Sequence, residues 1–119
     1  MMETTTNEAK RELDILLARI GESKAEDVVA YDVTSSSPFM SYAIIATCSN
    51  TRFLGALQGE LEECLDKHGI EVTVKEGEPD SGWVIIQGEE VLVHLMLASN
   101  RRMLDLEGLL EKLNKKYEA

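Results

Sequence analysis

The stretch WVIIQGEEVLVHLML, residues 83–97, holds two apolar runs on either side of a Gly-Glu-Glu turn. Because strand residues point alternately to the two faces of a sheet, Trp83 and Ile85 share one face and their neighbours share the other. Both faces are apolar, as in a strand that is covered on two sides. The pattern predicts a hairpin of strands 83–87 and 91–97.

Further helices and strands surround this hairpin. Apolar residues at helical spacing predict helices at 7–20, from 49 or 50 to 68, and at 100–117, and apolar β-branched runs predict strands at 28–33, 42–47 and 70–75. Thr5 and Glu8 fit a capping box at the start of the first helix.

The resulting order is α-β-β-α-β-β-β-α, without a repeat or a linker. It predicts a single domain over residues 1–119 of the α/β (α+β) class. The domain is expected to contain one mixed sheet of about five strands packed with helices. Residues 1–5 and 117–119 are expected to be loose ends.

Composition narrows the possible functions. The formal net charge is −10, so the chain lacks the excess of Lys and Arg that phosphate binding needs. We therefore expect no direct nucleic-acid recognition. The charge either only solvates the protein or also favours a basic partner. No run approaches the roughly 20 apolar residues of a membrane span, and the N-terminus lacks a secretory pattern. Cys48 and Cys64 have no Cys or His at ligand spacing, so we expect a cytoplasmic protein without a metal or cofactor.

The chain offers little catalytic chemistry. Of its two histidines, His68 ends a predicted helix and His94 lies within an apolar strand. No hydrolase, phosphate-loop or metalloprotease motif is present. The strand interiors carry no pair of carboxylates for metal-dependent nucleotidyl transfer. We therefore expect a protein that is not an enzyme, with a nucleotide-binding enzyme as the alternative.

The sheet itself suggests an interface. Trp83, Ile85 and Met96 would form an apolar patch if the helices covered only one face of the sheet well. Such a patch usually marks a partner surface. Alternatively, the first or last helix covers this second face, and the sequence pattern leaves both possibilities open.

Four segments carry a resemblance to a known family. They are AEDVVAYDV at 25–33, YAIIATCSNTR at 42–52, the E-G…W…V-H series at Glu76, Gly77, Trp83, Val93 and His94, and residues 101–109, which are similar to a closing R-x-x-Y-x-L-E-x-L motif. In this order they resemble the ribosomal silencing factor (RsfS, Iojap) family over most of the chain.

The resemblance implies a fold related to the nucleotidyltransferases but without their catalytic carboxylates. It implies a translation repressor that binds the large ribosomal subunit through ribosomal protein uL14 and sterically blocks association with the small subunit. Glu76 and Trp83 match family motif positions near the expected partner surface. Ile85 and Met96 join them from strand alternation alone. A homodimer that hides the same patch is a further possibility.

The sequence departs from the family pattern at several positions. The departures are Ser41, Cys48, Gln87, Leu104 and Leu110. They bear on the affinity for the partner more than on the fold.

Overall fold

The computed structural model describes the backbone of residues 2–117 and the side chains of residues 8–114, 116 and 117. Its elements are α1 (Met2–Gly21), β1 (Glu26–Asp32), β2 (Tyr42–Cys48), α2 (Thr51–Lys67), β3 (Val74–Glu76), the short 3₁₀ turn η1 (Pro79–Ser81), β4 (Trp83–Gln87), β5 (Val91–Leu97), α3 (Ala98–Leu104), α4 (Leu106–Leu113) and β6 (Lys115–Lys116).

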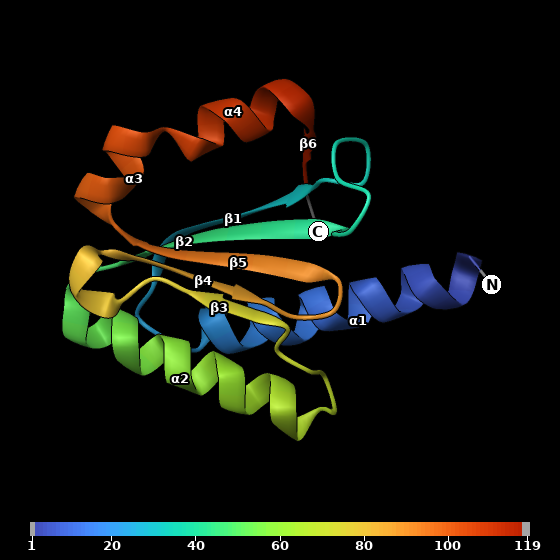
Figure 1. The fold of residues 1–119 in the computed structure, drawn as a ribbon, viewed down its shortest axis with the longest axis horizontal. Helices are drawn as coiled ribbons and strands as arrows, with labels where there is room; N and C mark the ends of the chain where they lie inside the picture. Colours follow the sequence, from blue (N-terminus) through green and yellow to red (C-terminus); the bar gives the residue numbers. More distant parts are fainter. Residues whose placement is uncertain (1, 118–119) are drawn as a thin grey trace.

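The strands form one mixed sheet in the order β3-β4-β5-β2-β1-β6. β2 and β5 are parallel neighbours at its centre, and all the other pairs are antiparallel. Helices α1 and α2 lie against one face, and α3 and α4 lie over the other (Figure 1). The expected mixed α/β architecture is confirmed.

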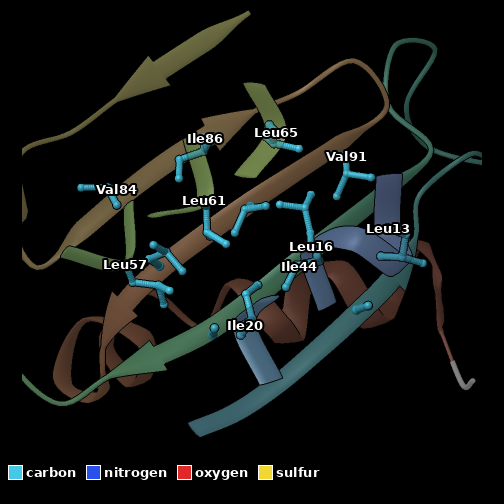
Figure 2. Close-up of a cluster of buried hydrophobic side chains, with 14 of the residues drawn as sticks. Leu13, Leu16, Ile20, Ile44, Leu57, Leu61, Leu65, Val84, Ile86 and Val91 are labelled. Atoms are coloured by element: carbon cyan, nitrogen blue, oxygen red, sulfur yellow. The ribbon is translucent and has the colours of Figure 1, made fainter. Parts of the chain in front are cut away.

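The main core fills the space between the sheet and the helices α1 and α2 (Figure 2). α1 contributes Leu13, Leu16 and Ile20, spaced at about one helical turn as an amphipathic helix requires. α2 begins after Asn50, whose side chain accepts a hydrogen bond from the Phe53 N–H at 2.8 Å. A cap at Ser49 or Asn50 is therefore confirmed, with Asn50 as the residue that caps the helix.

A buried carboxylate ties α1 to the β4–β5 hairpin. Glu12 is only 2% exposed and accepts backbone N–H bonds from Glu89, Glu90 and Val91, the shortest at 2.8 Å. Burial raises the pKa of Glu12, while these N–H donors act to lower it. At Gly88 an added Cβ would lie 2.5 Å from the Glu12 carboxylate, so this turn accepts only glycine without a shift.

The ends of the chain differ from the sequence prediction. The predicted helix over 100–117 is confirmed only in part, because it is divided into α3 and α4 by a break at Asp105 (φ 44°). Its last residues form the edge strand β6 instead. The Asp105 side chain accepts the Gly108 N–H at 3.2 Å, which caps α4 after the break. The predicted strand at 70–75 is shorter, since only Val74–Glu76 is a strand.

The predictions for the N-terminal helix and the chain ends can be compared with the structure only where it describes the residues. α1 begins at Met2, before the predicted start near residue 7. The predicted capping box involves the side chain of Thr5, which lies outside the described side chains. Of the predicted loose ends, residue 1 and residues 118–119 also lie outside the described residues, and residues 2–5 are helical.

Replacing Glu12 with alanine tests its role in holding the hairpin. We expect Glu12→Ala to lower the free energy of unfolding by about 1–3 kcal/mol, because hairpin N–H groups lose their acceptor. Urea unfolding measures the change, and Glu8→Ala, an exposed position on the same helix, is the matched control. Equal stability of the two variants would contradict this role.

Candidate docking surface on the sheet

The second face of the sheet is only partly covered. α4 places Leu106 and Leu110 over a small second cluster of buried side chains. The buried members of that cluster are Tyr31, Val33, Ala43, Ile45 and Met96. Most of them come from β1 and β2, so α4 covers that half of the face.

None of the described helices covers the half of this face that β3, β4 and β5 form. Its side chains Ile85, Gln87 and Leu92 are half-buried, and neither Ile85 nor Leu92 belongs to a buried cluster. The register places Glu76 opposite Ile85, and Gln87 opposite Leu92, on neighbouring strands. We call these four residues, with Trp83 at their end, the open face.

The structure separates the predicted partner residues. Glu76, Trp83 and Ile85 share the open face, and Glu76 is exposed. Met96 is fully buried, so its expected place on an uncovered patch is wrong. It pairs with Trp83 across the strands and packs within the cluster beneath α4.

Trp83 is held in place by a buried histidine. Its indole Nε1–H donates to Nδ1 of His94 at 3.1 Å, and the two rings lie 5.9 Å apart. Nδ1 must therefore be unprotonated, because it accepts this bond. Burial lowers the pKa of His94 to about 4, which keeps the ring neutral at physiological pH. His94 thus fixes the orientation of the half-buried Trp83 ring.

Exposed leucines on α4 border the open face. Glu111 and Glu107 lie on one flank of α4, where they bond to Tyr31 and to Arg101. At about 100° per residue, Leu109 and Leu113 lie beyond the sheet-facing side, on the flank away from these carboxylates. Both leucines are 56% exposed. They form an apolar wall beside the open face.

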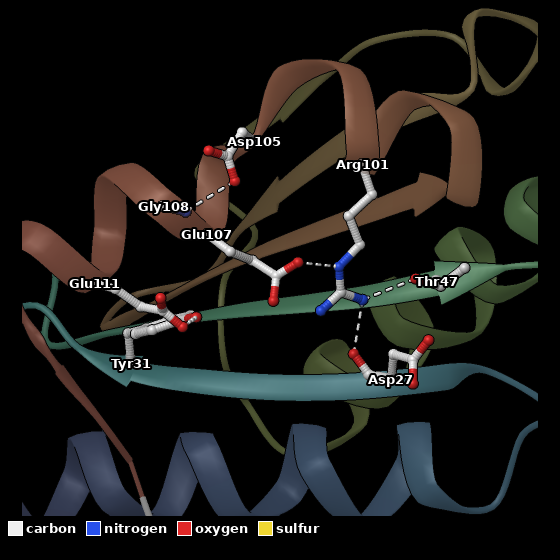
Figure 3. A network of polar contacts seen from close by, with 8 residues as sticks. All are labelled: Asp27, Tyr31, Thr47, Arg101, Asp105, Glu107, Gly108 and Glu111. Carbon is white, nitrogen blue, oxygen red and sulfur yellow. Dashed lines mark hydrogen bonds and ion pairs between the residues drawn. The ribbon is translucent and has the colours of Figure 1, made fainter.

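Arg101 connects three elements beneath α3 (Figure 3). Its Nε donates to Glu107 of α4 at 2.6 Å, and its Nη1 donates to the Asp27 carbonyl at 2.6 Å and to Thr47 Oγ1 at 2.7 Å. The hydrogen bond from Arg101 lowers the pKa of Glu107, so this carboxylate stays ionised. The strand-alternation argument could not identify Arg101, although the residue heads the closing motif segment.

An exposed carboxylate lies at the edge of the open face. Glu76 is exposed opposite Ile85, whereas Glu78 and Asp80 are exposed in the segment around η1, which packs against α2. They lie in a chain with a net charge of −10. Glu76 and the negative charge of the chain favour a basic partner over an acidic one. Among the described residues, no group of His, Cys, Asp or Glu is arranged to hold a metal ion.

Comparison with known proteins identifies the family to which this chain belongs. A family model described as "Ribosomal silencing factor during starvation" (RsfS) matches residues 6–118. The chain is a member of the ribosomal silencing factor family. The role of this family is to silence ribosomes, which is a regulatory role rather than a catalytic one. None of the helices in the described part of the chain combines the length and apolar content that crossing a membrane requires.

Individual relatives agree with this assignment. The ribosomal silencing factor RsfS of Bacillus subtilis is 29% identical over 97 residues, which are 82% of each chain. That of Haemophilus influenzae is 28% identical, over 82% of this chain and 95% of its own. A crystal structure from Bacillus halodurans has a TM-score of 0.80 and 25% identity, over 92% of this chain and 99% of that chain. A crystal structure from Chromobacterium violaceum has the same fold, with a TM-score of 0.81 and 24% identity, over 86% of this chain and 85% of that chain.

The neutral state of His94 predicts a pH dependence of stability. The folded-state pKa of about 4 lies below the ordinary value of 6.5, so the unfolded chain binds more protons between these values. The contribution of His94 to the free energy of unfolding is therefore fully present above pH 6.5. It declines as the pH falls toward 4, by up to about 1.4 kcal/mol per pH unit.

Urea unfolding at several pH values measures this decline. We expect His94→Gln, whose side-chain carbonyl can still accept the Trp83 N–H, to reduce the loss of stability upon acidification. His68→Gln, at an exposed histidine, is the matched control and should behave as the wild type does. An unchanged pH dependence in His94→Gln would contradict the assignment.

Proposed function

We propose that this protein represses translation by binding the large ribosomal subunit through ribosomal protein uL14. Once bound, its bulk would exclude the small subunit. Membership of a family described as silencing ribosomes supports this proposal. So does the open face, an apolar surface with the exposed Glu76 at its edge, which suits a basic ribosomal protein. This mode of action places the protein in the cytoplasm with the ribosomes.

The observation that carries the proposal is the half-covered sheet. Ile85 and Leu92 lie half-buried on its floor, and Leu109 and Leu113 stand exposed beside them. An apolar floor next to an apolar wall allows one inserted side chain to be desolvated on two sides. Glu76 lies at the rim, where a Lys or Arg of the partner can pair with it.

Burial changes which of the predicted partner residues can contact the partner. Met96 cannot contribute directly, because it is fully buried. Trp83 offers part of its ring, but it also supports His94, so its replacement would disturb the sheet as well as the surface. Ile85 and Leu109 are therefore the cleaner test positions.

We expect Ile85→Ala and Leu109→Ala each to weaken binding to purified large subunits by about 1–2 kcal/mol, because each removes apolar contact area. Cosedimentation with large subunits measures the affinity. Leu17→Ala is the matched control: Leu17 is also half-buried, but it packs into the core on the opposite side of the sheet. Unchanged affinity of both open-face variants would remove the docking surface.

Two further measurements separate the parts of the proposal. Purified uL14 should bind the wild-type protein directly and should bind Ile85→Ala less well. In sucrose gradients, the wild-type protein should reduce the joining of the two subunits. Binding without an effect on joining would contradict steric exclusion.

The two alternatives predict different outcomes. A nucleotide-binding enzyme would gain thermal stability with magnesium and nucleotide, and we expect no such gain. A homodimer formed through the open face would dissociate in the Ile85→Ala variant, which sedimentation equilibrium would detect.

A further inference from the structure

α4 forms the apolar wall of the proposed docking surface, yet it is held weakly. None of its residues is buried, whereas α2 buries a row of four leucines. Only Leu106 and Leu110 pack against the second cluster. A single residue, Asp105, separates α4 from α3 and has a left-handed backbone conformation. Helices with so little buried apolar contact are those that open most readily.

The polar contacts between α4 and the rest of the chain differ in strength. The bond from Arg101 to Glu107 is 2.6 Å long, and Arg101 is 9% exposed. The bond from Tyr31 to Glu111 is 3.3 Å long. The bond between Ser36 and Asn114 just beyond the helix is exposed to solvent. Arg101 is thus the strongest tether, because a charge-assisted bond with little solvent competition contributes most.

Arg101 is also the tether that reaches furthest into the sheet. Its Nη1 donates to the Asp27 carbonyl on β1 and to the Thr47 hydroxyl on β2. The guanidinium is planar, so fixing Nη1 on these two strands also fixes the direction of Nε toward Glu107. Arg101 therefore connects the N-terminal end of α4 to the centre of the sheet, while the edge strand β6 holds the other end on β1.

We propose that Arg101 is a positioning residue for docking, which holds α4 where Leu109 and Leu113 can contact the partner. This rests on the proposed function of the open face. Without the Arg101–Glu107 bond, β6 would still hold the C-terminal end of α4 on β1, but the first turns of the helix would be held only by Leu106 and Leu110. These turns would then shift, and Leu109 would move away from the floor. The partner would then have to order α4 when it binds, which weakens the affinity.

Hydrogen exchange tests whether Arg101 holds α4. In Arg101→Gln, amides of residues 106–113 should exchange at least about ten-fold faster, while those of α2 and β5 should stay protected. Arg102→Gln is the matched control, because Arg102 is exposed on the same helix and carries the same charge. Equal exchange of α4 in the two variants would overturn the proposal.

Binding to purified large subunits tests whether this positioning matters for docking. Arg101→Gln should weaken binding by about ten-fold, and adding Leu109→Ala should then weaken it by less than about two-fold, because the wall is already displaced. Adding Ile85→Ala, on the floor, should keep its full effect. If the effects of Arg101→Gln and Leu109→Ala on binding were fully additive, the proposal would be overturned. A general loss of stability, unlike a displaced wall, would leave Leu109→Ala and Ile85→Ala with equally large added effects.

A second variant keeps the test decisive if Arg101→Gln does not fold. Glu107→Gln weakens the same tether at its α4 end, where the side chain is 33% exposed, and leaves Arg101 on the sheet. It should show the same faster exchange of α4 and the same lack of additivity with Leu109→Ala. Exchange and binding that match the wild type would overturn the proposal.

The two proposals can fail separately. If the wild-type protein does not bind large subunits, the proposed function fails, and the docking role of Arg101 fails with it. If the wild type binds and Arg101→Gln binds equally well, only the positioning role fails.

Discussion

The parallel ladder between β2 and β5 is the constraint on which the rest of the structure depends. It pairs Tyr42–Cys48 with Val91–Leu97 residue for residue, and most side chains in both strands are buried. Two parallel neighbours need a long connection between them. Here that connection carries α2, β3 and β4, so the ladder determines where the helix covers the sheet and where the open face begins.

The two faces of the sheet are covered unequally, and this inequality produces the candidate site. On one face, the long helices α1 and α2 bury a continuous apolar core. On the other, the chain after β5 provides only the short helices α3 and α4 and a two-residue strand. Because α4 lies over β1 and β2, the side chains of β4 and β3 remain accessible. The same shortage of cover leaves leucines of α4 exposed and makes polar tethers such as Arg101 more important.

Buried polar groups hold each of these layers in place. Glu12 connects α1 to the hairpin, His94 orients Trp83, and Arg101 connects α4 to β1 and β2. Each group has its partners within the chain, and no buried side-chain polar atom in the described part of the chain lacks one. The core therefore resembles that of an ordinary stable domain, and the unusual feature is an apolar surface that remains outside it.

The sequence by itself determined the strands at 83–87 and 91–97, the helix after Asn50, the mixed sheet and the family, because strand alternation, helical spacing and motif order are all local patterns. Motif positions and strand alternation in the sequence also assigned Glu76, Trp83 and Ile85 to one surface. Tertiary structure alone decided that Met96 is buried and that Arg101 joins three elements, because both depend on where α4 packs. The break at Asp105 redirects that helix, and Asp105 tolerates a left-handed conformation only because its side chain caps the next turn. Periodicity shows which side of a helix is apolar, but not how far a neighbouring sheet will cover it.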